Sequence, residues 1–384
     1  MIYFVLDLEG LKMKKKIIVL GAGYAGLMAV NRLAKLNQNY KILLINESDT
    51  FVERIRNHEF AAGREVPQHK INNLIPNQVE LLVDRVESLD PKSKTIQFAS
   101  AKKKHNYDYL IYALGSTSEA NSNNKSLAVN TRWKASELRK SLKGKQAGNL
   151  WILGAGLTGI ELATEIKESY PELKVGLIDK NLFANDFSSQ ARNYLLKTFQ
   201  KMDIDFLENE NFEIHENSIF LSKSKTKLQA DLIVQSFGFQ CCDLGSKSDL
   251  KVNAKNQILV DASLQVAEYP EIFVAGDSAY VQGSHLRMGC VTAMPMGVHV
   301  AEMVHRSAKG LPVKDFLFGF AGRCVSLGRK QGLIQMTNTR DEPNSIIITG
   351  RLGAIIKEFV CKYTLFSICL EKYFSFRTYF WPKG

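Results

Sequence analysis

Two glycine-rich turns of the form GxGxxG are the residues of this 384-residue chain whose spacing most clearly predicts chemistry. The first turn runs from Gly21 to Gly26 (GAGYAG) and the second from Gly154 to Gly159 (GAGLTG). In such a turn the first glycine allows a tight bend, the second lets the backbone approach a pyrophosphate, and the third lets the next helix pack closely. The start of that helix offers unpaired N–H groups to the phosphates. Each turn therefore predicts a dinucleotide site.

An acidic residue follows each turn at the distance where a dinucleotide ribose is bound. Glu47 lies 21 residues after Gly26, and Asp179 lies 20 residues after Gly159. A carboxylate at this place accepts hydrogen bonds from the ribose hydroxyls and repels a 2′-phosphate. We therefore expect FAD or NAD at each turn, with NADH preferred over NADPH at the second, where the neighbouring Lys180 softens the discrimination. A turn that serves packing alone is the alternative for either copy.

The flanking sequence predicts the elements that hold these turns. Residues 17–20 form an apolar strand, a helical pattern follows the first turn, and residues 40–45 form a second strand. The same order returns around the second turn, with strands at 150–153 and 175–178. Two such βαβ units predict an α/β fold with two Rossmann-like dinucleotide-binding domains. Between them, the polar stretch 116–130 is expected to cross from one domain to the other.

A third strand and a further helix are predicted downstream. Residues 271–275 form an apolar strand that runs into Gly276-Asp277, and a helix is expected from about Pro295 to His305. At the other end of the chain, Met13 is a natural start, so residues 1–12 are expected to be an extension.

Charge and cysteine content narrow the function classes. The chain has 50 Lys and Arg against 39 Asp and Glu, a net charge of +11, which suggests a polyanionic partner such as nucleic acid, an anionic membrane or phosphate-bearing cofactors. No nucleic-acid-binding motif accompanies the basic residues, so nucleic acid is not expected. The six cysteines all follow residue 240 and form no CxxC pair, so neither a metal site nor a disulfide framework is expected. No apolar run reaches the roughly 18 residues of a membrane span.

Four motifs in this order resemble the two-dinucleotide-binding-domain flavoproteins of the pyridine nucleotide-disulfide oxidoreductase superfamily, over about residues 14–310. The first turn with Glu47 looks like the FAD fingerprint, and residues 109–115 look like the strand that closes the first FAD segment. The second turn with Glu161 looks like the inserted NAD(P)H fold. Residues 273–277 look like the second FAD motif, whose aspartate binds the ribityl chain.

The resemblance implies a domain plan and a set of cofactor contacts. The FAD domain is expected to be discontinuous, at 13–118 and 253–315, with the NAD(P)H domain inserted at 119–252 and a small C-terminal domain at 316–384. The expected FAD contacts are Gly21, Gly23, Tyr24, Ala25, Gly26, Glu47, Arg54, Ala113, Gly115, Gly276 and Asp277. The expected NAD contacts are Gly154, Gly156, Leu157, Thr158, Gly159, Glu161 and Asp179.

Residues 51–58 (FVERIRNH) are similar to the stretch that follows the ribose acid in type II NADH dehydrogenases and their soluble relatives. This implies an FAD-dependent NADH oxidoreductase that passes electrons to an acceptor, often a quinone. Arg54, Arg56 and His58 are candidates to face the FAD phosphates or the acceptor, with a solvated charge cluster as the alternative. Because no cysteine precedes Cys241, a dithiol mechanism is excluded.

The acceptor stays open at this stage. Quinone-reducing members typically carry an AQxAxQ segment after the second FAD motif, where this chain has Thr292–Gly297 (TAMPMG). A soluble flavoprotein reductase of a ferredoxin-type protein or a small molecule is therefore an alternative, as is a flavin redox sensor with low turnover. Because the flavin carries the chemistry, no catalytic side chain is assigned. We expect the start of the helix near Pro295–Gly297 to face the charge on reduced flavin. The candidates to lie near the flavin are Thr292, Ala293, Met294 and Gly297.

The C-terminal tail combines basic and aromatic residues. Nine aromatic residues lie between Phe359 and Trp381, and six basic against two acidic residues follow residue 350. In type II NADH dehydrogenases the C-terminus anchors the protein to a membrane surface, and this mixture suits an interface. Packing on the FAD domain and a homodimer contact are the alternatives. The expected location is the cytoplasm, either free or peripheral on the inner face of the cell membrane.

Overall fold

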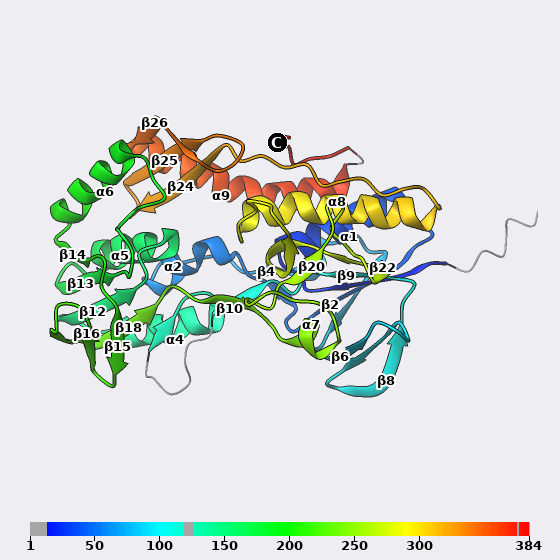
Figure 1. Cartoon of the computed structure of the whole chain (residues 1–384), viewed down its shortest axis with the longest axis horizontal. Coiled ribbons are helices and arrows are strands. Elements are labelled where there is room, and N and C mark those ends of the chain that lie inside the picture. Colours follow the sequence, from blue (N-terminus) through cyan, green and yellow to red (C-terminus); the bar gives the residue numbers. More distant parts are fainter. Residues whose placement is uncertain (1–13, 119–125, 375, 384) are drawn as a thin grey trace, which may run out of the picture.

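Two parallel sheets with helices packed on them form the body of the protein, as the computed structural model shows (Figure 1). The structure describes residues 14–118, 126–374 and 376–383. The expected extension at 1–12 and the middle of the crossing stretch predicted at 116–130 lie outside the described residues.

The first sheet has six strands in the order β21-β22-β9-β1-β2-β5 and is assembled from two separate stretches of the chain. All neighbours pair in parallel except β21 with β22. The strands are β1 (Lys16–Leu20), β2 (Lys41–Asn46), β5 (Val79–Val83), β9 (Tyr109–Tyr112), β21 (Gln265–Val266) and β22 (Tyr269–Val274). Helices α1 (Tyr24–Leu36) and α8 (Cys290–Ala308) lie together on one side of this sheet (Figure 1).

The second sheet has five parallel strands in the order β11-β18-β12-β13-β14. The strands are β11 (Leu127–Ala128), β12 (Gly148–Leu153), β13 (Leu173–Ile178), β14 (Ile204–Leu207) and β18 (Leu232–Gln235), and the helices of this part are α4 (Arg132–Leu142), α5 (Leu157–Ser169) and α6 (Ser189–Lys201). Because the glycine turns join β1 to α1 and β12 to α5, both predicted βαβ units are present.

Several short strands and helices lie between and beside the two large sheets. Antiparallel sheets are formed by β6 (Val86–Asp90), β7 (Thr95–Phe98) and β8 (Ala101–Asn106), and by β15 (Phe212–His215), β16 (Ser218–Leu221) and β17 (Lys227–Gln229). Two-stranded pairs join β3 (Thr50–Phe51) to β4 (His69–Lys70), β10 (Ser116–Ser118) to β19 (Phe239–Cys241), and β20 (Ile258–Val260) to β23 (Ala279–Val281). The short helices are η2 (Arg54–Arg56), α2 (Asn57–Ala61), α3 (Ile71–Leu74), α7 (Leu244–Lys247) and η3 (Gly276–Ser278).

The C-terminal part is an antiparallel sheet followed by a long helix. Its strands are β24 (Gly322–Leu327), β25 (Gln331–Thr337) and β26 (Pro343–Thr349), and α9 (Gly350–Tyr373) follows directly. One side of α9 is buried at helical spacing, at Gly353, Lys357, Cys361, Thr364, Ile368 and Glu371. Asn31 of α1 donates a hydrogen bond to the Ile368 carbonyl at 3.0 Å, which ties α9 to the first dinucleotide helix.

The predicted start of the helix after the second FAD motif is wrong. Helix α8 begins at Cys290, not near Pro295, because Ala293 N–H already bonds to the Gly289 carbonyl at 3.0 Å. Pro295 sits inside the helix, where the missing N–H costs a single backbone hydrogen bond. The free N–H groups at the helix start therefore belong to the residues from Cys290 onward, and the segment Thr292–Gly297 lies within the buried body of the helix.

Gly297 lets α8 cross α1 at close range, which gives a testable stability prediction. A Cβ at this position would lie 2.2 Å from the Ala25 carbonyl oxygen, whereas a Cβ at Gly156 would meet no atom within 4 Å. We expect Gly297→Ala to lower the free energy of unfolding by about 1–3 kcal/mol, the usual cost of overpacking. Urea denaturation of the FAD-loaded protein measures the change, and Gly156→Ala is the matched control. Equal unfolding midpoints for the two variants would contradict the close crossing.

Candidate functional site

The first glycine turn has an open face where a phosphate can approach. A Cβ at Gly21 would lie 2.4 Å from the Ala113 carbonyl oxygen, and a Cβ at Gly26 would lie 1.8 Å from that of Gly21, so both positions need glycine for packing. At Gly23 a Cβ would meet nothing within 4 Å, and Gly23 is exposed at the start of α1. Gly21 and Gly26 thus permit close packing, as predicted, and Gly23 leaves an open face. This open face fits a dinucleotide pyrophosphate.

Equivalent hydrogen bonds from the two turns show which residues correspond to each other after each turn. Asp179 accepts a hydrogen bond from Ala155 N–H at 2.7 Å, and Asn46 accepts the equivalent bond from Ala22 N–H at 2.9 Å. The counterpart of Asp179 in the first unit is therefore Asn46, and Glu47 lies one residue further on and is exposed. The amide oxygen of Asn46 can accept a hydrogen bond, but it carries no charge.

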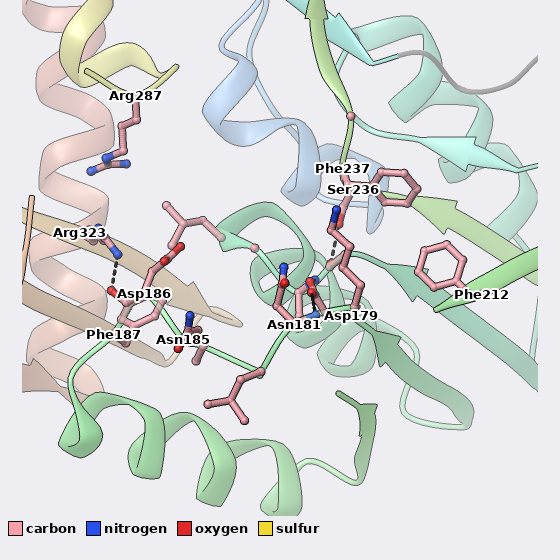
Figure 2. Close-up of a pocket in the computed structure, with 18 residues that line it drawn as sticks. Asp179, Asn181, Asn185, Asp186, Phe187, Phe212, Ser236, Phe237, Arg287 and Arg323 are labelled. Atoms are coloured by element: carbon pink, nitrogen blue, oxygen red, sulfur yellow. Dashed lines mark hydrogen bonds between the residues drawn. The ribbon is translucent and has the colours of Figure 1, made fainter. Parts of the chain in front are cut away.

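A cavity of about 590 Å³ lies against the second turn. We call it the second-turn cavity, and Figure 2 shows the side chains around it. Its lining includes the turn residues Gly154, Ala155, Gly156 and Leu157, the loop residues Asp179, Lys180, Asn181, Leu182, Ala184, Asn185, Asp186 and Phe187, and Phe212, Ser236, Phe237, Gly238, Arg287 and Arg323. Gly156 is exposed and leaves space at the start of α5, as Gly23 does at α1. The shape and the N–H groups suit a dinucleotide.

The carboxylate of Asp179 is held in place on both oxygens. One oxygen accepts a hydrogen bond from Ala155 N–H at 2.7 Å, and the other accepts one from Asn181 N–H at 2.8 Å. These contacts orient the charge toward the place that a ribose takes, which favours hydroxyls over a 2′-phosphate. Thr158, Gly159 and Glu161, also expected to contact NAD, are absent from the cavity lining.

Three of the expected FAD contacts meet at the second FAD motif. Asp277 accepts hydrogen bonds from Ser116 Oγ at 2.6 Å and from Gly289 N–H at 2.9 Å, and Arg54 Nη1 lies 3.5 Å from the same carboxylate. A Cβ at Gly115 would lie 3.7 Å from Arg54 Nη1. Arg54, Gly115 and Asp277 thus share one site next to the start of α8.

A buried group of charged residues joins four parts of the chain, and we call it the junction cluster. It consists of Arg56, His58, Glu59 and Arg64 from the segment after β3, Glu161 and Glu165 of α5, Arg329 between β24 and β25, and Lys357 and Glu358 of α9. Arg56 binds the carboxylates of Glu59 and Glu358, and His58 shares a hydrogen bond with Ser326 Oγ at 3.2 Å. Of the three candidates, only Arg54 faces the FAD motif. Burial lowers the pKa of His58 well below its usual range, and Lys357 adds to this, so the imidazole is neutral at pH 7.

Glu161 points into this cluster. Its Oε1 accepts hydrogen bonds from Ser326 N–H at 3.0 Å and Ser326 Oγ at 3.1 Å, and it lies 3.5 Å from Lys357 Nζ. Burial disfavours the charge on Lys357, but the carboxylates of Glu161 and Glu59 outweigh it and raise its pKa above the ordinary value. Lys357 is therefore a permanent buried cation, and its Nζ donates no hydrogen bond to protein within the described residues.

The four flavin candidates of α8 are all buried, and two of them have clear packing roles. Met294 fills the core, with none of its surface exposed, and Gly297 allows the crossing of α1. Thr292 Oγ1 donates to the Arg287 and Gly289 carbonyls, which fixes the start of α8. Cys290 opens the helix beside Tyr24, and burial raises the pKa of its thiol to about 12. All six cysteines are free, and this one is protonated at neutral pH.

The family model for "Pyridine nucleotide-disulphide oxidoreductase" matches residues 15–303, well over half of the chain and both glycine turns. The chain belongs to this family. Membership, together with the relatives below, confirms the expected α/β flavoprotein with FAD- and NAD-binding domains, its oxidoreductase activity, and FAD and NADH as cofactors.

Relatives and solved structures agree with this assignment. The chain is 26% identical to a type II NADH:quinone oxidoreductase of Staphylococcus epidermidis, covering 90% of this chain and 94% of the relative. It is 27% identical to its counterpart in Staphylococcus haemolyticus, covering 92% and 96%. Among solved structures, sulfide:quinone oxidoreductase of Aquifex aeolicus has a TM-score of 0.80 at 19% identity, covering 93% and 92%. NDH2 of Plasmodium falciparum in complex with NADH has a TM-score of 0.78 at 16% identity, covering 94% and 99%.

Several site residues of this oxidoreductase carry no signal in a single sequence. In the sequence, Glu47 is the expected ribose ligand, so the preceding Asn46 draws no notice. Lys357 cannot be told from the other basic residues of the tail. Arg287, Arg323 and Phe237 reach the second-turn cavity from separate segments of the chain. Only the sheet register and the docking of α9 reveal these positions.

The junction cluster predicts a large stability cost for removing one charge. Glu165 is fully buried and binds Arg64 at 2.7 Å and Arg329 at 3.3 Å. We expect Glu165→Gln to lower the free energy of unfolding by about 3–5 kcal/mol because it removes a fully buried charge that Arg64 and Arg329 share, leaving each with one remaining carboxylate partner. The control is Asp243→Asn, which removes an exposed pair with Lys247 and should cost less than about 1 kcal/mol. Urea denaturation compares them, and similar losses would contradict the role of the cluster.

Proposed function

We propose that the protein is a peripheral NADH:quinone oxidoreductase. The observation that carries the proposal is Lys357, a buried ammonium group whose Nζ donates no hydrogen bond to protein within the described residues. It lies where α9, α5 and the segment after β3 meet. The names of the staphylococcal relatives support the same acceptor.

The residues of the chain divide the reaction between two sites. The second-turn cavity binds NADH through the α5 N-terminus and Asp179, and the first turn with Arg54 and Asp277 binds FAD. FAD, when bound, accepts hydride from NADH and passes two electrons on. The overall balance is NADH + H⁺ + quinone → NAD⁺ + hydroquinone, so the acceptor gains one proton beyond the hydride.

In this reaction, Lys357 would act on the quinone, where negative charge develops. A quinone carbonyl gains negative charge as it is reduced, and a buried cation stabilises such charge far more than a solvated one does. Because the pKa of Lys357 is raised, it keeps its charge across the physiological range. Glu161, 3.5 Å away, holds the ammonium group in place, and Cys361 lies one helical turn further along the same buried face of α9.

This role predicts an acceptor-specific defect. With NADH as donor, we expect the wild-type protein to reduce menadione and a ubiquinone analogue at saturable rates. Lys357→Met should lower kcat with the quinones about 10- to 100-fold, while the rate of flavin bleaching by NADH changes little. Steady-state assays and stopped-flow flavin spectra measure both steps.

The control variant is Lys247→Met, an exposed lysine. Turnover with a ferredoxin or a soluble dye in the absence of any quinone activity would refute the quinone acceptor. Fast flavin bleaching with no reoxidation by any acceptor would instead support the sensor alternative.

The outer side of α9 and the tail after it present exposed apolar side chains. On α9 they are spaced at three, four and seven residues opposite the buried face, at Leu352, Ile355, Phe359 and Phe366. At the end of α9 and beyond it, they continue at Tyr373, Phe374, Phe376 and Phe380. Lys362 is exposed on the same outer side. Among the described residues, no helix has the length and hydrophobicity that crossing a bilayer requires. An amphipathic helix with aromatic and basic residues suits the surface of an anionic membrane instead.

Membrane contact through α9 gives a prediction for vesicle binding. We expect Phe359→Ser combined with Phe366→Ser to weaken co-sedimentation with vesicles that contain anionic lipid by at least about tenfold, because each buried ring contributes 1.5–3 kcal/mol or so. Trp133→Ser, which removes an aromatic side chain exposed on α4, is the control and should bind as the wild type does. Unchanged vesicle binding with a change from dimer to monomer in light scattering would assign this face to a homodimer.

A further inference from the structure

An exposed aromatic ring stands at one end of the second-turn cavity. Phe237 follows strand β18, lines the cavity and is 41% exposed. Phe212, the first residue of β15, lines the same end, and the two ring centroids lie 5.8 Å apart with their planes at 59°. Neither ring is explained by the phosphate and ribose contacts already described.

The two rings lie on the adenosine side of the cavity. In Figure 2, Phe237 and Phe212 are on one side of Asp179, and Arg287 and Arg323 are on the other. Asp179 marks the ribose that carries the base, so the base extends past it toward the rings. The nicotinamide half then runs toward Arg287, two residues before Gly289, whose N–H bonds to the FAD-motif residue Asp277.

The ring geometry decides how a base can bind. A base inserted between two parallel rings needs them about 7 Å apart, twice the stacking distance of about 3.4 Å. Phe212 and Phe237 are closer than this and strongly tilted, so no base fits between them. Phe212 instead packs against Phe237 from one side, and the 41% of Phe237 that stays exposed is available for stacking.

The backbone at Phe237 is fixed relative to the glycine turn. Ser236 Oγ donates hydrogen bonds to the Gly154 carbonyl at 2.6 Å and the Leu153 carbonyl at 3.1 Å. The next residue, Gly238, also lines the cavity and has a φ of +75°, a conformation that favours glycine. Phe237 is therefore held beside the turn that binds the pyrophosphate, and little conformational freedom is lost when a ligand binds.

We propose that Phe237, supported by Phe212, is the stacking platform for the adenine of NADH and makes the adenosine half the main source of its affinity. The proposal rests on the use of NADH and is independent of the electron acceptor. Stacking on an aromatic face is indifferent to which base is present, so nucleotides with other bases and a 5′-diphosphate should also compete with NADH for this cavity.

Calorimetric titration of the full-length, FAD-loaded protein with ADP-ribose tests the platform without any electron transfer. We expect Phe237→Ala to weaken ADP-ribose binding about 5- to 150-fold, the range measured when a stacking ring is removed. Phe237→Tyr should bind within about twofold of the wild type because it keeps the flat ring. Phe237→Leu keeps an apolar side chain but loses the flat face, and we expect it to bind at least about fivefold more weakly.

The controls separate stacking from a general structural effect. Trp133→Ala removes an aromatic side chain that is 68% exposed on α4 and should leave ADP-ribose binding unchanged. The FAD content and the unfolding midpoint of each variant are measured in parallel, and the Leu variant decides the question where the Ala variant does not fold. Wild-type affinity in Phe237→Leu, or weak binding in both Phe237→Leu and Phe237→Tyr, would overturn the platform. Failure of quinone turnover in the wild type would leave these binding results, and this inference, untouched.

Discussion

The junction cluster is the constraint on which the arrangement of this oxidoreductase depends. Folding removes the charged groups of this cluster from water. This desolvation costs several kcal/mol for a buried ion unless oppositely charged partners are in position. Arg56 reaches Glu59 at 3.1 Å within its own segment and Glu358 of α9 at 2.9 Å. Arg329 bridges Glu59 and Glu165 at 3.1 and 3.3 Å. No single element can satisfy these charges, so α5, α9 and the β24–β25 hairpin must all dock together.

This joint docking sets the two halves of the site relative to each other. Because α5 begins at the second turn and also supplies Glu161 and Glu165, the end of the dinucleotide helix is anchored to the C-terminal part. The hairpin also supplies Arg323, whose Nη1 donates to the Asp186 carbonyl at the edge of the second-turn cavity. The cavity is therefore completed by a part of the chain that lies about 140 residues beyond the loop it closes. The C-terminal part thus contributes to the lining of the second-turn cavity.

The sequence predicted what is local and missed what depends on register or docking. Both βαβ units and the roles of Gly21, Gly23 and Gly26 follow from steric rules that act within a few residues. Which side chain ends the second strand of the first unit depends on a one-residue register, and here an exposed acid conceals Asn46. The start of α8 was predicted near Pro295 because proline is favoured in the first turn of a helix. In the structure, Pro295 lies inside α8. The contacts assigned to individual cofactor residues, and the domain bounds, stay predictions.

The buried character of α8 is consistent with the proposal that Lys357 of α9 serves the acceptor. The segment Thr292–Gly297 is buried, and Gly297 leaves no room for a side chain at the Ala25 carbonyl. In the proposed function the polar group for the acceptor comes instead from Lys357 of α9. The same helix exposes Ile355 and Phe359 within one turn of Lys357 on its outer side. In the proposed function, the buried cation on one face of α9 and the apolar surface on the other allow the same helix to serve both a quinone and a membrane surface.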